Sequence, residues 1–478
     1  MQALLMKHFL FMLGVTVFTS IVATAVPFWG VMLYYGFATL RPQSIWAWSL
    51  SNSPQVRWSL LAMLVAAVAT LINLSSILET FRNNRVFTLL CVYATLMLMS
   101  MLTAFNPATS WYWAQEYGKV FVMFAIATLV IQRFWQVRAM ALMLVLCLGY
   151  IAYHFNSMYF LEGGRLDIFH YGFAGLDNNG AGSLLAMGLP FAYFLAMSPA
   201  GKWPKFSRVV GIIAGLLILH AILMSYSRGA MLAGAFGLFW LIMHHRPRIQ
   251  AAALSMCMVV VIGVMAGAEI RERAMSTMDY ETDASALSRL DSWSAAWDIV
   301  WEHPILGKGI RNSNEYSQNY GADLAGRTIH NQYLQIAADS GIPAALVYIA
   351  MLTLALLGLR RARLRCIQAG EYFEKNPNPK GPHDSQQLMD RARDGELLCL
   401  ALQTSLLMFA FSSMFLSVEL LELPWLLLAL SGILPMAIDR RLEGLGYSGT
   451  HKQGTHLYTP PPMPQAPKAI PEPVRKAA

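Results

Sequence analysis

The stretch GIPAALVYIAMLTLALLG, residues 341–358, decides the fold class of this chain because it is apolar and holds no charged residue. A helix rises about 1.5 Å per residue, so about 20 apolar residues cross the roughly 30 Å hydrocarbon core of a bilayer. Every backbone N–H and C=O group in that core needs an internal partner, which favours a helix. A transmembrane barrel would show short segments of alternating polarity instead. We therefore interpret residues 341–358 as a membrane-spanning helix.

Comparable apolar segments recur along most of the 478 residues, of which 56% are hydrophobic and 13% are charged. Soluble domains carry about 25% charged residues. The segments are 5–40, 57–77, 86–104, 117–132, 139–155, 180–197, 209–225, 229–243, 250–268, 341–358, 398–416 and 423–438. They predict an all-α polytopic membrane protein with about 12 transmembrane helices, or one more if segment 5–40 breaks at Pro27 and crosses twice. The apolar N-terminal segment is interpreted as a retained span rather than a cleaved signal peptide.

The basic residues predict the orientation of these spans. They fall on alternate loops, which the positive-inside rule assigns to the cytoplasm. These loop residues include Arg82, Arg85, Arg133, Arg138, Lys202, Lys205, Arg208, Arg246, Arg248, Arg360, Arg361, Arg363 and Arg365. The net charge of +8 is therefore attributed to cytoplasmic loops and not to nucleic-acid binding. We expect a multi-pass membrane protein whose other set of loops faces outward.

Three segments depart from the rhythm of spans and short turns. Within the predicted transmembrane domain, residues 1–438, the outward segment 269–329 is unusually long, and its apolar residues recur at helical spacing. It predicts a large helical loop on the outward side, which is the periplasmic side in a bacterial inner membrane. Residues 359–397 are polar and predict a mobile cytoplasmic loop. The proline-rich residues 439–478 predict a disordered cytoplasmic tail.

Two arginines and a histidine are the strongest candidates for chemistry on the outward side. Arg228 stands where one span ends and the next begins, and Arg289 and His330 belong to the segments around the long loop. Arginine neutralises a pyrophosphate leaving group with two parallel hydrogen bonds and keeps its charge. A histidine accepts a proton near neutral pH. The alternatives are an interfacial arginine that reaches to lipid headgroups and a structural histidine.

Other outward residues have both a functional and a structural interpretation. The turn around Lys308, between Gly307 and Gly309, exposes N–H groups to an anion, or is an ordinary turn. Asn178 could donate to a sugar, but Asp177 or Asn178 is also placed to cap a helix.

Metal binding has a weaker basis in the sequence. Residues 279–283, with Asp279, Glu281 and Asp283, are the one outward acidic cluster with suitable spacing, and a solvated loop is the alternative. The five cysteines, Cys91, Cys147, Cys257, Cys366 and Cys399, have neither disulfide nor zinc spacing. A reaction without metal or other cofactor is the simpler interpretation.

Taken in order, the motifs between residues 175 and 360 resemble those of the O-antigen ligase and polymerase superfamily. They are Leu176-Asp177-Asn178-Asn179, Ser225-Tyr226-Ser227-Arg228-Gly229-Ala230, Ser288-Arg289, Pro304-Ile305-Leu306-Gly307-Lys308-Gly309, Ile329-His330-Asn331-Gln332-Tyr333-Leu334-Gln335 and Ser340-Gly341-Ile342-Pro343. The His-Asn, nine-residue, Gly signature of the family's ligases matches His330, Asn331 and Gly341. Ala344 departs from the Gly, Thr or Tyr that often follows. Residues 34–43, YYGFATLRPQ, resemble a subgroup near exopolysaccharide or exosortase gene systems.

The resemblance implies a helical fold like that of the C-type glycosyltransferases, with the long loop capping an outward cavity. It also implies transfer of a glycan from undecaprenyl pyrophosphate to an acceptor hydroxyl, with O-antigen and lipid A-core as the expected donor glycan and acceptor. Arg228 and Arg289 would bind the pyrophosphate and His330 would activate the acceptor, without metal or nucleotide. Asn331, Lys308, Arg311 and Asn178 are assigned to substrate binding. Membrane lipids are expected partners, and the resemblance implies a location in the bacterial inner (plasma) membrane with the active site on the periplasmic face.

Three other functions remain open at this point. A polymerase would use the same donor-binding arginines to extend a lipid-linked glycan, and a protein O-oligosaccharyltransferase would use a protein acceptor. A flippase or transporter would carry charged residues and broken helices deep within its spans, whereas the notable polar residues here cluster outside.

Overall fold

The structure is a computed structural model that describes residues 2–50, 56–81, 84–201, 204–245, 284–321, 324, 326–377, 384–418 and 420–447. All regular elements in these ranges are helices, apart from an isolated β-bridge between Phe173 and Leu176. Residues 2–447 belong to one compact unit. Together with the apolar spans below, this confirms an all-α polytopic membrane protein.

The helices of the first half are α1 (Gln2–Ala25), α2 (Phe28–Leu40), α3 (Pro42–Ile45), α4 (Ala47–Leu50), α5 (Trp58–Ile72), α6 (Leu74–Thr80), α7 (Arg85–Ser100), the 3-10 turn η1 (Met101–Thr103), α8 (Pro107–Val130), α9 (Phe134–Leu161), α10 (Asp167–Tyr171), α11 (Asn178–Ala186), α12 (Leu189–Met197), α13 (Pro204–Met224) and α14 (Arg228–His244). The second half contributes α17 (Ala284–Glu302), α18 (Ser313–Tyr316), the 3-10 turn η4 (Ser317–Tyr320), α19 (Gln332–Lys375), α20 (Ser385–Ser412) and α21 (Glu422–Gly444).

Eight of the described helices, counting α11 with α12, are long and apolar enough to cross a membrane, or nine if the bent pair α5 and α6 forms one span. The helices α2 and α14 are apolar but shorter, and α8 covers the predicted span 117–132. Every predicted span thus overlaps a described helix except 250–268, which lies outside the described residues. The count of about twelve spans stays a prediction.

The N-terminal apolar segment is broken at Pro27, where the sequence left one or two crossings open. Proline lacks an N–H group, so α1 ends before it and α2 begins directly after it. The His8 ring, near the start of α1, stacks on Trp46 at 4.9 Å, and its Nδ1 lies 2.9 Å from Ser49 Oγ. The start of α1 therefore lies beside residues that follow α2, so the two helices run in opposite directions. This geometry favours two passes.

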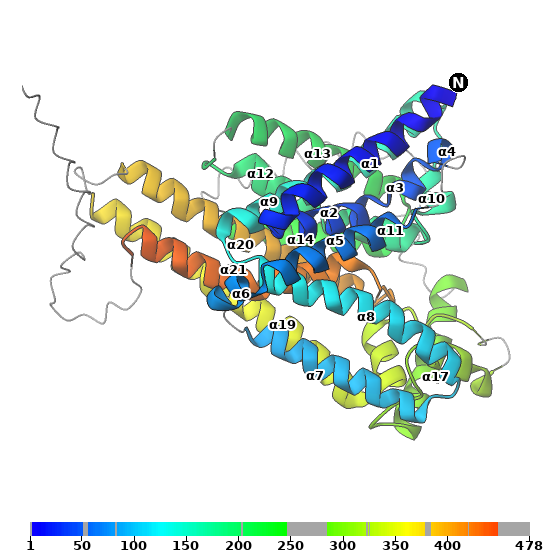
Figure 1. Cartoon of the computed structure of the whole chain (residues 1–478). Coiled ribbons are helices and arrows are strands. Elements are labelled where there is room, and N and C mark those ends of the chain that lie inside the picture. Colours follow the sequence, from blue (N-terminus) through cyan, green and yellow to red (C-terminus); the bar gives the residue numbers. More distant parts are fainter. Residues whose placement is uncertain are drawn as a thin grey trace, which may run out of the picture. The chain divides into compact units, whose positions relative to one another are not determined.

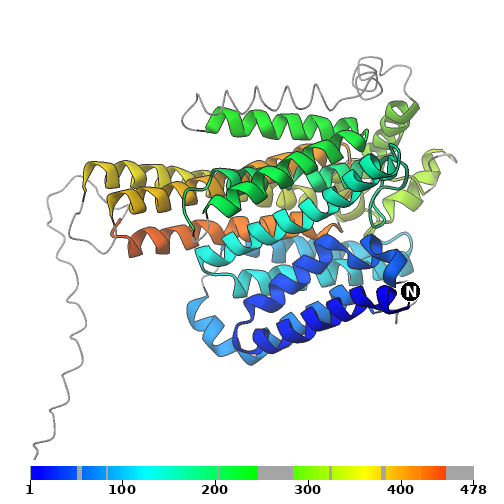
Figure 2. The ribbon, with the colours of Figure 1, turned by 90° about the horizontal axis from the view of Figure 1, so that it is seen from above.

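The C-terminal helices form the centre of the bundle. Figure 2 shows α19, α20 and α21, coloured yellow to red, between the blue N-terminal helices and the green helices α13 and α14. In the apolar window of α20, 83% of the residues are buried, against 17% in α1. Helix α20 is therefore enclosed by protein, whereas α1 presents most of its apolar surface outward.

An aromatic cluster joins four of these helices. Tyr93 of α7 and Tyr348 of α19 have ring centroids 5.7 Å apart, and Trp425 of α21 lies 5.0 Å from Phe121 of α8. Such pairs add about 0.5–1.5 kcal/mol each beyond the burial of their area. The four helices lie side by side in Figure 1.

Within the described residues, the loops that the sequence assigned to opposite sides of the membrane lie at opposite ends of the helices. We call the end at which α11, α14 and α19 begin the motif end. The other end, called the basic end, carries Arg138, Asp394 and Arg441. There the Arg138 and Arg441 guanidiniums lie 3.0 and 3.3 Å from one oxygen of the fully buried Asp394 carboxylate.

Two predicted boundaries differ from the structure. Segment 359–397 was expected to be a loop, but α19 continues to Lys375 and α20 begins at Ser385. Its charged residues are good helix formers, so the helices extend beyond their apolar parts. The tail was expected from residue 439, but α21 runs to Gly444 and Tyr447 still belongs to the helical unit. Residues 448–478 lie outside the described part.

Candidate functional site at the motif end

Backbone strain is concentrated at the motif end. The non-glycine residues with positive φ in the described ranges are Arg41, Ala174, Tyr226, Arg311 and His330, at 45°, 55°, 50°, 58° and 56°. A left-handed conformation costs a residue with a side chain roughly 1–2 kcal/mol. Strain of this kind persists where surrounding contacts enforce it, and it clusters at functional sites.

Two of the sequence motifs interlock through hydrogen bonds. The Asn178 Nδ2 group donates to the Ser225 carbonyl at 2.9 Å, and the Ser227 hydroxyl donates to Asn179 Oδ1 at 2.8 Å. These bonds hold the beginning of α11 beside the beginning of α14. Gly182 permits this approach, because a Cβ there would lie 2.8 Å from the Ser225 hydroxyl oxygen.

Asp177 caps α11, as the sequence allowed, by accepting a hydrogen bond from the Gly180 N–H group at 2.7 Å. It follows a two-residue hairpin in which Phe173 and Leu176 exchange both backbone hydrogen bonds at 2.9 Å. Positive φ at Ala174 and Gly175 is the signature of a type I′ turn. The hairpin and the cap fix the position of the Asp177 carboxylate.

The same carboxylate acts on two predicted catalytic residues. Burial lowers the pKa of Arg289 below its ordinary value, and the charge of Asp177 opposes that shift. Burial also lowers the pKa of His330, the nearby charge of Arg289 lowers it further, and Asp177 again opposes the shift. The fold therefore brings Asp177, Arg289 and His330 within electrostatic range. An imidazole with a lowered pKa is neutral at pH 7 and can accept a proton.

Arg228 is the first residue of α14 and is half-buried. Ser227 caps this helix by accepting a hydrogen bond from the Ala230 N–H group at 3.2 Å. A cation in the first turn is unfavourable, because the N-terminus of a helix is itself partially positive. A bound anion would stabilise both Arg228 and the partially positive first turn of the helix.

Asn331, predicted to bind substrate, caps α19 by accepting from the Tyr333 and Leu334 N–H groups, both at 3.1 Å. Ten residues further on, α19 is broken at Gly341, where φ is 86°. A Cβ at Gly341 would lie 2.0 Å from the Ile305 carbonyl oxygen. The signature glycine thus allows the loop around residue 305 to pack against the break in the helix.

Lys308 and Arg311, also assigned to substrate binding, contact other side chains at this end. The Lys308 ammonium lies 4.3 Å from the centre of the Tyr316 ring, and the Arg311 guanidinium lies 5.1 Å from the centre of the Trp113 ring. Backbone hydrogen bonds from the Lys308 N–H group to the Ala338 carbonyl at 3.0 Å, and from the Gly309 N–H group to the Asp339 carbonyl at 2.9 Å, anchor the loop on α19. Their predicted roles stay predictions.

The described ranges contain no candidate metal site, because no three or more His, Cys, Asp or Glu side chains there are grouped so that they could hold a metal ion. The acidic cluster at residues 279–283 lies outside them. The expectation of a metal-independent reaction stays a prediction.

Sequence reasoning missed two features of this end. One is the electrostatic role of Asp177, which was interpreted only as a helix cap. The other is a cavity of about 500 Å³ whose lining includes Arg41, Lys119 and Glu422 and none of the predicted site residues. The segment YYGFATLRPQ, which stood out in the sequence, supplies Tyr34, Arg41 and Gln43 to it.

The comparison with known families concerns the part of the chain that carries most of these motifs. No curated protein matches the chain significantly. Residues 213–349 match the family model of O-antigen ligase, and this segment includes Arg228, Arg289, His330 and Gly341. The match supports assignment of this multi-pass membrane protein to the O-antigen ligase superfamily.

Proposed function

We propose that the protein transfers a glycan from undecaprenyl pyrophosphate to an acceptor hydroxyl, with O-antigen as the glycan and lipid A-core as the acceptor. The reaction takes place at the motif end, on the periplasmic face of the inner membrane. The family match supports a glycan-transfer role that uses a lipid-linked donor and an acceptor. The observation that carries the proposal is the grouping of Arg289 with His330 and Asp177, next to the α14 terminus that begins with Arg228.

In the proposed step, the acceptor oxygen attacks the anomeric carbon of the donor glycan. A glycosidic C–O bond forms, the bond from that carbon to the pyrophosphate oxygen breaks, and undecaprenyl pyrophosphate leaves. The acceptor proton passes to the neutral imidazole of His330, and Asp177 stabilises the imidazolium. Arg228 and Arg289 neutralise the charge that develops on the leaving pyrophosphate. In a partly desolvated site, one well-placed hydrogen-bond donor to such a charge stabilises the transition state by roughly 3 kcal/mol.

The test is transfer by purified protein in detergent with a lipid-linked glycan, lipid A-core and EDTA. Product should form with wild-type protein and fall by about 100-fold or more in H330A and in R289Q. The matched control is R85Q, which removes an exposed arginine from the first residue of α7 at the basic end. Its rate should stay near wild type.

Other outcomes separate the alternatives. A product that remains attached to the carrier lipid and lengthens would replace ligase by polymerase within the same family. Wild-type rates in both H330A and R289Q would place the chemistry elsewhere. Loss of activity in EDTA with recovery on adding Mg²⁺ would overturn the metal-independent step.

A further inference from the structure

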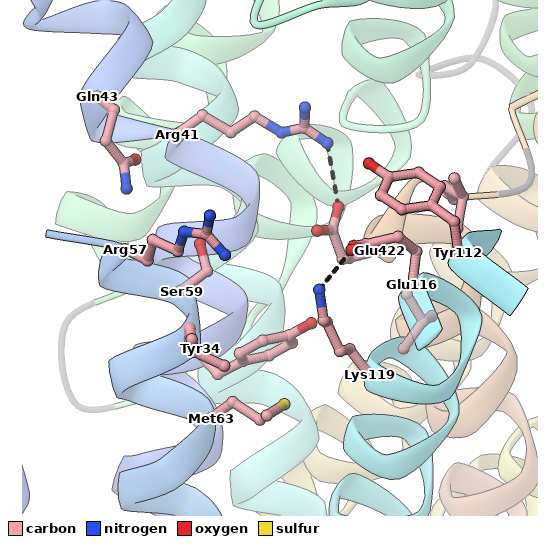
Figure 3. A pocket seen from close by; sticks show the side chains of 13 residues that line it. Tyr34, Arg41, Gln43, Arg57, Ser59, Met63, Tyr112, Glu116, Lys119 and Glu422 are labelled. Atoms are coloured by element: carbon pink, nitrogen blue, oxygen red, sulfur yellow. Dashed lines mark hydrogen bonds and ion pairs between the residues drawn. The ribbon is translucent and has the colours of Figure 1, made fainter. Parts of the chain in front are cut away.

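The cavity of about 500 Å³ at the motif end is formed by the end of α2 and the beginnings of α5, α8 and α21 (Figure 3). Its volume lies in the range of about 300–1,000 Å³ typical of small-molecule sites. Charged side chains from all four elements line it: Arg41, Arg57, Glu116, Lys119 and Glu422. It is distinct from the group formed by Asp177, Arg289 and His330.

Two ion pairs give the wall alternating donors and acceptors. The Arg41 guanidinium lies 3.2 Å from Glu422, and the Lys119 ammonium lies 2.5 Å from Glu116. Each carboxylate has lone pairs beyond the one in its ion pair, and each cation has further N–H groups. Neighbouring hydroxyls of a sugar both donate and accept, so they match such a surface. A site for a bare phosphate would not hold two carboxylates, because like charges repel.

The cavity also carries one positive charge in excess, since three cations face two carboxylates. Arg57 directly precedes α5 and is exposed. Its backbone carbonyl accepts from the Leu61 N–H group at 3.0 Å, but its guanidinium forms no ion pair or hydrogen bond with a side chain in the described part of the chain. In Figure 3 it stands beside Ser59 on the wall opposite the Lys119–Glu116 pair. A ligand with a single anionic group would complete the charge balance of the cavity.

Two tyrosine rings contribute to the apolar part of the lining, together with Leu60, Met63, Val120 and Leu420. Tyr34 is buried, whereas Tyr112 is 57% exposed, so the ring of Tyr112 remains available for contact. Pockets for small molecules combine aromatic surface with a few placed polar groups. The C–H face of a sugar ring suits such a surface, with its hydroxyls directed to the ion pairs.

A single guanidinium joins this cavity to the proposed reaction centre. Besides its contact with Glu422, Arg41 donates from Nη1 to the Ala174 carbonyl at 2.7 Å. Ala174 belongs to the hairpin that directly precedes Asp177. A sugar in the cavity would therefore contact Arg41, the residue that supports the loop carrying Asp177. A glycan substrate held at the proposed reaction centre could extend into this cavity.

We propose that this cavity binds a sugar residue that carries one anionic group, a carboxylate or a phosphate. That this sugar belongs to a glycan substrate, of donor or acceptor, rests on the proposed function. The binding itself rests on the ion pairs, the aromatic ring and the excess charge of Arg57.

The test measures binding by saturation-transfer NMR, with the full chain in phosphatidylcholine nanodiscs. The probes are methyl glucuronide, methyl glucoside and inorganic phosphate. The glucuronide should bind more tightly than the glucoside, and R57Q should weaken binding of the glucuronide about tenfold, which corresponds to about 1.4 kcal/mol. The glucoside should change by less than about twofold in R57Q. Y112A should weaken both sugars, and R85Q should change neither.

Three results would overturn the proposal. The first is that neither glycoside binds, and the second is that R57Q and R85Q weaken binding of the glucuronide equally. The third is that inorganic phosphate binds the protein while neither glycoside competes with it. The same titration in H330A separates this inference from the proposed function. If wild-type protein and H330A both bind the glucuronide but even wild-type protein transfers no glycan, the assignment of the cavity stands and the proposed transfer reaction is wrong. If wild-type protein transfers the glycan but no sugar binds in the cavity, the proposed function stands and the assignment of the cavity is wrong.

Discussion

At the scale of the residue, His330 combines a strained backbone with an electrostatic environment that keeps its side chain neutral. Its φ is 56°, and burial together with the charge of Arg289 lowers its pKa below 6.5. Asp177 acts in the opposite sense. The protonated fraction of His330 thus depends on two charges from distant parts of the sequence, and each charge can be removed separately.

The substitution D177N removes the charge and keeps a side chain that can cap α11, because asparagine caps as well as aspartate. Loss of the carboxylate lowers the pKa of His330 further, so the neutral base persists to lower pH. The acidic limb of the transfer rate should move to lower pH, measured between about pH 5 and pH 8. R289Q removes a charge that lowers the pKa of His330, so the acidic limb of its residual activity should move to higher pH. A midpoint that is unchanged in both variants would rule out His330 as the group that titrates.

The close packing around Gly341 leads to a prediction about stability. In G341A the new Cβ would lie 2.0 Å from the Ile305 carbonyl oxygen and the residue would keep a φ of 86°, so the loop around residue 305 must move. We expect a loss of at least about 2 kcal/mol in the free energy of unfolding, seen as a lower midpoint of thermal unfolding in detergent. The matched control is G358A on the same helix, where the nearest atom is Pro435 Cγ at 3.7 Å. G358A should be neutral or stabilising by about 0.5–1 kcal/mol, and equal losses in both variants would contradict the explanation.

At the scale of the element, helix beginnings build the motif end. Asp177, Ser227 and Asn331 cap α11, α14 and α19 with side-chain oxygens. The sequence signatures therefore serve two purposes, because the residues that start these helices stand beside those assigned to the reaction. Capping and substrate binding by Asn331 have to be separated by experiment.

Asn331 permits that separation. N331A removes the acceptor for the Tyr333 and Leu334 N–H groups and should lower stability by about 1 kcal/mol, whereas N331D retains a cap. If the side chain also donates to substrate, N331D should unfold like wild type but raise the KM for the glycan acceptor or donor. Wild-type kinetics in N331D would reduce the residue to a cap.

At the scale of the whole molecule, a network of buried charges joins several helices at one end of the bundle. The basic end is held by Asp394, whose carboxylate pairs with Arg138 of α9 and Arg441 of α21 and accepts from the Ser198 hydroxyl. One buried group thus joins α9, α20 and α21 with the loop after α12. Removing one member of such a network leaves uncompensated charges in a buried site.

D394A should therefore destabilise the bundle by about 3–5 kcal/mol, measured as the shift of thermal unfolding in detergent. The control E374A removes an exposed carboxylate near the end of α19 and should change the free energy of unfolding by less than about 0.5 kcal/mol. A D394A protein as stable as E374A would mean that the network contributes nothing to stability.

The sequence by itself determined most of the helices. Hydropathy over about 20 residues is a local property, so each predicted span outside residues 250–268 overlaps a helix, and Pro27 marks a real break. Local hydropathy did not reveal where α19 and α20 continue past their apolar parts, because helix propensity there is independent of the membrane. Local hydropathy also gave no information on the site, so its residues could be predicted mainly from the order of the motifs along the chain.

Only the tertiary structure decided which side chains share a site. Asp177, Arg289 and His330 lie far apart in the sequence and come within electrostatic range of one another because the beginnings of α11, α17 and α19 lie at the same end of the bundle. The cavity lined by Arg41, Lys119 and Glu422 likewise draws its charges from separate helices. Helix formation follows from the neighbours along the chain, whereas the contact of two side chains depends on how whole helices pack against one another.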